Sequence, residues 1–141
     1  MIQIFTDGAS RGNPGPAGIG GLIIHNEETI FELSQYLGTQ TNNVAEYSAL
    51  FEILKKLIVL VPSSNLTNEE IICMADSELM IKQLNGEYKI KHPNLIPIFQ
   101  NIKKLTKSIP KIKFKHIPRE ENKEADQLAN MAIDCADTTD P

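Results

Sequence analysis

Hydrophobic and polar positions alternate along the first part of the chain. Alternation over residues 2–7 and 29–37, together with a glycine-led aliphatic run over 17–26, predicts three strands joined by short turns. From Asn43 onward the apolar positions fall three and four residues apart, which is typical of an amphipathic helix, and Pro62 ends this pattern. The chain is therefore expected to open with an antiparallel meander followed by a long helix.

The rest of the chain alternates between the two kinds of element. Residues 71–75 form an apolar run expected to be a buried strand, and helical spacing follows until Gly86. The pattern then predicts a helix over 94–108, a strand over 111–117 and a last helix over 122–136. This order predicts an α/β fold with a five-stranded mixed sheet, in which three antiparallel strands are followed by parallel crossovers, with helices on both faces.

Length and composition narrow the class of protein. A chain of 141 residues with 41% hydrophobic residues suits one domain, expected over 1–137 with a frayed tail at 138–141. No apolar run approaches the roughly 18 residues of a membrane span, and the first residues lack the layout of a secretion signal. The two cysteines match neither a disulfide framework nor a zinc spacing. We expect a cytoplasmic protein, monomeric and without a membrane partner.

The net charge of −4 conceals an uneven distribution of charge along the chain. Between Lys82 and Arg119 there are ten basic residues and one acid, Glu87, whereas the remainder holds four basic and seventeen acidic residues. A basic face on an acidic protein suits a nucleic-acid backbone, because binding follows local potential and counterion release. The alternative is a solvated, lysine-rich surface without a partner.

Four carboxylates stand at candidate functional positions, and each has an ordinary structural explanation. Asp7 could be a turn residue after the first strand. Glu46 has capping-box spacing from Asn43, and Asp76 precedes a helix as an N-cap would. Asp126 lies in the first turns of the last helix, where the helix dipole favours an acid.

Taken together, the four acids indicate a metal site. Asp7 and Asp76 are expected to end strands where open α/β sheets bind ligands, and Glu46 and Asp126 begin helices that must pack on that sheet. Two charges about 5 Å apart repel by roughly 3 kcal/mol, so a cluster of four would take up protons or bind cations. A pair of divalent ions would neutralise it and supply phosphoryl-transfer chemistry. Oxygen ligands without cysteine or clustered histidine favour Mg²⁺ or Mn²⁺ over zinc.

Four segments, in order along nearly the whole chain, resemble the motifs of type 1 ribonucleases H. They are TDGASRGNPGPAG at 6–18, TNNVAE at 41–46, Asp76-Ser77, and REENKEADQLA at 119–129. This resemblance implies a ribonuclease H-like fold and endonucleolytic cleavage of the RNA strand of an RNA/DNA hybrid, leaving 5′-phosphate and 3′-hydroxyl ends.

The same resemblance implies roles for individual residues. The metal ligands would be Asp7, Glu46, Asp76 and Asp126, holding two Mg²⁺ ions with substrate, with Mn²⁺ as the alternative. Contacts in the minor groove, whose 2′-hydroxyls distinguish RNA from DNA, are implied for Gly12, Asn13, Asn43 and Glu78, with Asn42 and Ser77 in the same substrate-binding motifs. Thr41 would bind a phosphate of the DNA strand, or it is simply a helix-entry hydroxyl.

Two features depart from the pattern of many bacterial members. The segment at 86–95 is brief and the chain has no tryptophan, so the basic protrusion of those members is lacking. We therefore expect the substrate to be bound by Lys89, Lys91 and the lysines around 103–115. The residue that assists product release is either His116, ten residues before Asp126, or Arg119, which relatives with a similar fourth motif use; Arg119 is preferred.

Two other functions stay open on the sequence. Another nuclease or strand-transferase of the same fold would share the acids but should lack the Gly12-Asn13 and Asn42-Asn43 groups. A non-catalytic nucleic-acid-binding module would normally lack at least one acid, and here all four are present. Cleavage of double-stranded RNA in addition to hybrid is also left open.

Overall fold

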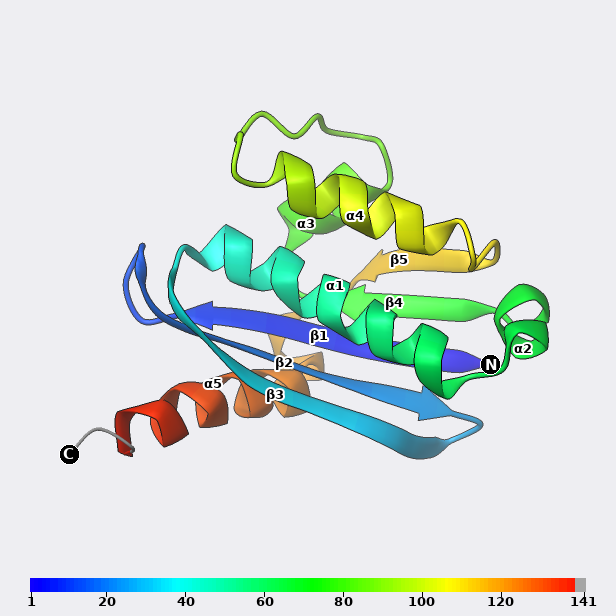
Figure 1. Ribbon diagram of the computed structural model, residues 1–141, viewed down its shortest axis with the longest axis horizontal. Helices are drawn as coiled ribbons and strands as arrows, with labels where there is room; N and C mark the ends of the chain where they lie inside the picture. The colour runs from blue at the N-terminus through cyan, green and yellow to red at the C-terminus, as the bar shows by residue number, and fades with distance from the viewer. Residues whose placement is uncertain (139–141) are drawn as a thin grey trace.

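Five strands form one mixed sheet with helices on both faces (Figure 1). In the computed structural model, which describes residues 1–138, the first half contains β1 (Ile2–Ser10), β2 (Gly15–His25), β3 (Glu28–Gln40) and α1 (Asn42–Leu60). The second half contains α2 (Ser63–Asn68), β4 (Ile71–Ala75), α3 (Glu78–Leu84), α4 (Ile96–Thr106), β5 (Ile112–His116), a 3₁₀ turn η1 (Arg119–Glu121) and α5 (Lys123–Thr138). The strand order is β3-β2-β1-β4-β5, antiparallel from β3 to β1 and parallel from β1 to β5, which confirms the predicted fold class.

The two faces of the sheet are covered by different helices. On one face α1 packs against β1 and β2, with α4 beside it. The apolar stripe of α1 comprises Leu50, Ile53, Leu54 and Leu57, all at most 1% exposed, and burial of each contributes roughly 1.5–3 kcal/mol. On the other face α5 packs across β2, β3 and β1. Within the described residues, no helix has the length and apolar character to cross a membrane.

The first strand is longer than the alternation predicts. We expected it to end at Asp7, but β1 continues to Ser10, because β2 begins early enough to pair with it as far as Ser10 and Ala17. Asp7 therefore lies within a strand, and its interpretation as a turn residue is wrong. On the other side of β1, pairing with β4 ends at Phe5 and Met74, so Asp7 lies just beyond the end of β4.

Other differences occur where the sequence is polar or at the ends of elements. The helix α2 was not expected, because its sequence SSNLTN is typical of a loop and only Leu66 is buried. The 3₁₀ turn η1 was also missed. Helix α5 extends one residue beyond the predicted domain boundary at 137, and the rest of the predicted tail, 139–141, lies outside the described residues.

Candidate functional site

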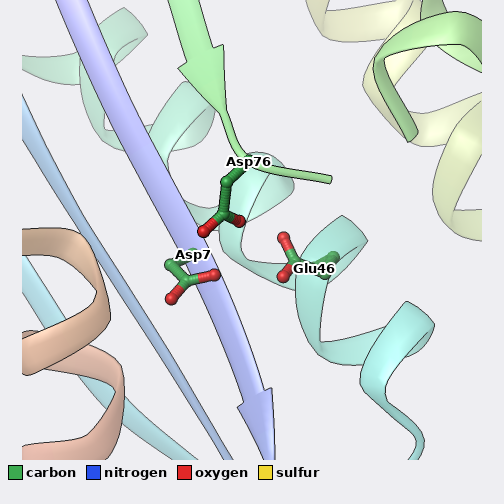
Figure 2. Close-up of side chains that lie close together, drawn as sticks. All are labelled: Asp7, Glu46 and Asp76. Atoms are coloured by element: carbon green, nitrogen blue, oxygen red, sulfur yellow. The ribbon is translucent and has the colours of Figure 1, made fainter. Parts of the chain in front are cut away.

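Three carboxylates from separate parts of the chain meet at one edge of the sheet. Asp7 comes from β1, Glu46 from α1 and Asp76 from the residue after β4, and one oxygen of each lies within 4.8 Å of the others. Figure 2 shows the three side chains directed toward one another. Asp7 and Glu46 are each only 5% exposed. This is the donor arrangement that a hard divalent cation requires.

The fourth acid, Asp126, reaches the same place from the opposite face of the sheet. It lines, with the other three, a cavity of about 420 Å³. It does not belong to the group that lies within 4.8 Å, but its negative charge is near enough to help raise the pKa of Asp7. The structure thus brings three of the predicted acids into contact range and puts the fourth in the same cavity.

Two glycines allow the helices to approach the acids closely. A Cβ atom on Gly8 would lie 2.3 Å from the carbonyl carbon of Ala45, the residue before Glu46. A Cβ atom on Gly20, which pairs with Asp7 across the sheet, would lie 2.3 Å from the carbonyl oxygen of Ala125. Because neither glycine has a side chain, α1 and α5 both bring a carboxylate to β1.

The ordinary helix-capping explanations do not account for Glu46 and Asp76. The N-cap of α1 is Thr41, whose hydroxyl accepts a hydrogen bond from the Val44 amide over 3.3 Å. The N-cap of α3 is Ser77, whose hydroxyl accepts from the Met80 amide over 3.3 Å. Glu46 and Asp76 are therefore not needed as caps, and the buried Oε2 atom of Glu46 has no hydrogen-bond partner in the described part of the chain.

Burial and repulsion between neighbouring acids raise the pKa of Asp7 and of Glu46. Burial raises the pKa of Asp7 to about 7; a hydrogen bond with Glu46 opposes the rise, and the charges of Asp76 and Asp126 add to it. Burial, and then the charge of Asp7, raise the pKa of Glu46 well above its ordinary value. A buried carboxylate oxygen without a hydrogen-bond partner, in a group of acids that repel one another, is a site that a cation would satisfy, so the residues fit a divalent metal.

The remaining predicted site residues divide between two hollows. Asn42, Ser77 and Arg119 line the cavity that contains the acids. Asn43, Lys89 and Lys91 line a second hollow of about 540 Å³, whose other lining residues are Leu79, Gln83, Glu87, Tyr88, His92 and Leu95. Asn42 and Asn43 are consecutive, so the first turn of α1 stands between the two hollows.

Five predicted residues line neither hollow. Thr41 caps α1, and Asn13 accepts a hydrogen bond from the Asn42 amide over 3.2 Å, which ties the loop containing Gly12 and Asn13 to the same helix end. Glu78 pairs with Lys82 at 2.8 Å, and Lys82 and His116 lower the pKa of Glu78. His116 ends β5 with its side chain exposed.

Five residues that line the acid cavity were assigned no role from the sequence: Gly8, Ala9, Ser10, Arg11 and Asn130. Arg11 lies inside the first motif segment, between Asp7, an expected metal ligand, and Gly12, an expected substrate contact. Asn130 lies four residues after Asp126, a spacing that puts both side chains on one face of a helix and could have drawn attention to it. In the second hollow, the exposed side chains of Leu79 and Tyr88 were also missed.

Comparisons with known proteins agree with this geometry. A family described as "Reverse transcriptase-like" matches residues 5–132. The chain is 45% identical to LC11-RNase H1, crystallised in complex with an RNA/DNA hybrid, with a TM-score of 0.90 over 96% of this chain and 99% of that one. It is 35% identical to ribonuclease HI of Halobacterium salinarum over 96% of this chain and 65% of that protein.

Some relatives are much longer than this chain. The bifunctional protein Rv2228c of Mycobacterium tuberculosis is 36% identical over 137 residues, which are 96% of this chain but 36% of that protein. The chain thus spans about a third of the length of the first curated relatives that it matches.

Proposed function

This chain belongs to the type 1 ribonuclease H family, and on that premise we propose that it is an endonuclease that hydrolyses the RNA strand of RNA/DNA hybrids. The observation that carries the proposal is the group of Asp7, Glu46 and Asp76, with oxygen atoms within 4.8 Å of one another in a cavity that Asp126 also lines. The hybrid bound by LC11-RNase H1, 45% identical, supports the substrate class.

The four acids would hold the catalytic cations. Family members use divalent metal, and the all-oxygen donor set, with neither histidine nor cysteine among the described residues that line the cavity, favours Mg²⁺, with Mn²⁺ as a substitute. Two such ions, when bound with substrate, would supply activation of a water and stabilisation of the departing oxygen, leaving 5′-phosphate and 3′-hydroxyl ends. Asp7 and Glu46 must lose their protons before they can act as ligands, because burial raises the pKa of both.

The residues around the acids would orient the RNA strand. Asn42 and Ser77 line the acid cavity with short polar groups, which can bond to 2′-hydroxyls in the minor groove without reading bases. Gly12 and Asn13 are held beside them by the contact between Asn13 and Asn42. Arg119, exposed at the rim of the cavity, would assist the release of the cleaved strand.

The second hollow would receive the DNA strand. It begins at Asn43, directly after the residue that faces the acid cavity, so a duplex that straddles the first turn of α1 would present one strand to each hollow. Lys89 and Lys91 supply positive charge for phosphates, and Tyr88 and Leu79, 52% and 46% exposed, supply apolar surface for sugars.

A cleavage assay tests this function. One end-labelled RNA is offered as hybrid, as duplex RNA and as single strand, with Mg²⁺, Mn²⁺ or a chelator. We expect cleavage of the hybrid that requires metal and that Asp7→Asn and Asp76→Asn abolish while hybrid binding persists. Binding without cleavage would indicate a non-catalytic module, and equal cleavage of DNA duplex would indicate another nuclease of this fold. Cleavage of duplex RNA would extend the substrate range.

A further inference from the structure

The side chain of Asn130 contacts Asp126 inside the acid cavity. Its Nδ2 donates to Asp126 Oδ1 over 3.2 Å and to the Asp126 carbonyl oxygen over 3.0 Å. Its Oδ1 accepts from Nη2 of Arg11 over 3.4 Å. Asn130 is therefore fixed at both ends of its amide, with the nitrogen facing two acceptors and the oxygen facing a guanidinium donor.

Arg11 is itself anchored on the same helix. Its Nη2 lies 2.6 Å from Oδ1 of Asp134 and 3.4 Å from the carbonyl oxygen of Asn130. Asp126, Asn130 and Asp134 follow one another at intervals of four residues and so share one face of α5. Arg11 directly follows β1 and precedes Gly12, so this contact also joins α5 to the loop beside the cavity.

The orientation of the Asp126 carboxylate is subject to repulsion from the other acids. It lies outside the group within 4.8 Å and comes from a helix on the opposite face of the sheet, where its carboxylate can turn away from three like charges. An amide donor on the next turn restrains that rotation, because the hydrogen bond is satisfied in one orientation of the carboxylate.

We propose that Asn130, held by Arg11, is a positioning residue that keeps the Asp126 carboxylate oriented for a divalent cation in this cavity. This inference rests on the metal site of the proposed function but not on the identity of the nucleic-acid substrate. Asn130 lies outside the four motif segments, and the family resemblance implies no role for it.

Equilibrium binding of Mn²⁺, followed by the paramagnetic resonance signal of the free ion, tests the proposal without nucleic acid. Asn130→Ala and Asn130→Leu should weaken the affinity for Mn²⁺ by about 10-fold or more, as loss of an outer-shell partner does. Asn101→Ala, an exposed asparagine on α4, is the matched control and should leave the affinity unchanged. Asn130 is only half-buried, and circular dichroism verifies that both variants fold.

A second arm asks whether Asn130 acts through Asp126. In an Asp126→Asn background, Asn130→Ala should have no further effect on Mn²⁺ affinity, whereas a merely structural role would cause the same loss in both backgrounds. Unchanged affinity in both Asn130 variants, or an equal loss without Asp126, overturns the inference. Wild-type protein that binds Mn²⁺ but leaves hybrids intact contradicts the proposed function alone, and wild-type protein that binds no Mn²⁺ contradicts both.

Discussion

The side-chain amide of Asn122 donates a hydrogen bond of 2.9 Å to the backbone carbonyl of Thr6. Thr6 precedes Asp7, and the carbonyl of Asn122 accepts from the Asp126 amide over 3.1 Å. Asn122, which is 1% exposed, therefore connects the backbone of β1, which carries Asp7, to the backbone of α5, which carries Asp126. Because the contact is buried, water cannot replace it when it is lost.

Replacing Asn122 with alanine should lower both stability and cleavage. Loss of a buried hydrogen bond costs roughly 1–3 kcal/mol in the free energy of unfolding, which urea denaturation measures. Cleavage should fall further than the loss of folded protein explains, since the connection between Asp7 and Asp126 is loosened. Asn101→Ala, on the exposed side of α4, should change the free energy of unfolding by less than about 0.5 kcal/mol. Equal stability of the two variants would contradict this role.

The raised pKa of Asp7 predicts how the stability of the metal-free protein depends on pH. Its pKa rises from 3.8 to about 7 on folding, so between these values the folded protein holds a proton that the unfolded chain has released. Asp7 therefore favours folding at low pH, and that contribution is lost as pH rises toward about 7. Asp7→Asn should raise the free energy of unfolding at pH 8 by roughly 1–4 kcal/mol and make it less dependent on pH.

Addition of Mg²⁺ should reverse the effect of pH on the stability of the wild-type protein. Bound cations favour the deprotonated acids, so Mg²⁺ should raise the melting temperature of the wild-type protein most at high pH. The same addition should have much less effect on Asp7→Asn. Melting temperatures in chelator check the direction of the effect. If the melting temperature of the wild-type protein rises more between pH 5 and pH 8 than that of Asp7→Asn does, then Asp7 does not favour folding at low pH.

Gly20 should be intolerant of any side chain, because its Cβ would meet backbone and not a flexible group. The nearest atom, the carbonyl oxygen of Ala125, would lie at 2.3 Å. Gly20→Ala should therefore displace α5, with a loss of roughly 1–3 kcal/mol or more in the free energy of unfolding and weaker binding of Mn²⁺. Gly86→Ala is the control: its φ of +80° is unfavourable but its surroundings are open, so about 1 kcal/mol is expected without a change in Mn²⁺ affinity.

Much of this arrangement was predictable from the sequence, and the reasons for the failures are specific. The periodicity predicted the succession of strands and most helices along the chain, and the sequence alone identified the four acids. The extent of β1 past Asp7 was missed because pairing with β2, and not local pattern, determines where that strand ends. The contact of Asn130 with Arg11 and that of Asn122 with Thr6 were missed because each joins segments more than a hundred residues apart.

Two lysines that line the second hollow are expected to make a salt-dependent contribution to hybrid binding. Lys89 and Lys91 both line this hollow, whereas Lys104, on α4, and Lys107, the C-cap of α4, are exposed and line neither hollow. Replacing Lys89 and Lys91 with alanine should weaken hybrid binding and reduce the slope of log affinity against log salt by about 1–2, because each phosphate contact contributes about 0.9. The Lys104→Ala/Lys107→Ala pair tests the expectation that the lysines around 103–115 also bind the substrate. Because neither residue lines the second hollow, we expect the slope to stay unchanged. If that pair reduces the slope instead, the duplex passes over α4.

Arg119 and His116 are the two candidates for the residue that assists release of the cleaved strand, and variants of each distinguish between them. Arg119 lines the cavity that contains the acids, whereas His116 lies at the end of β5 beside Glu78 and does not line it. If Arg119 assists release of the cleaved strand, Arg119→Ala should lower kcat by roughly 10- to 100-fold with little change in KM for the hybrid. Arg119→Lys should recover only part of the loss, since a lysine keeps the charge but not the planar fork that bonds a phosphate through two nitrogens. His116→Ala should change kcat less than about 3-fold. A larger effect at His116 than at Arg119, measured in single-turnover and steady-state cleavage of the same hybrid, would reassign the helper role to the histidine.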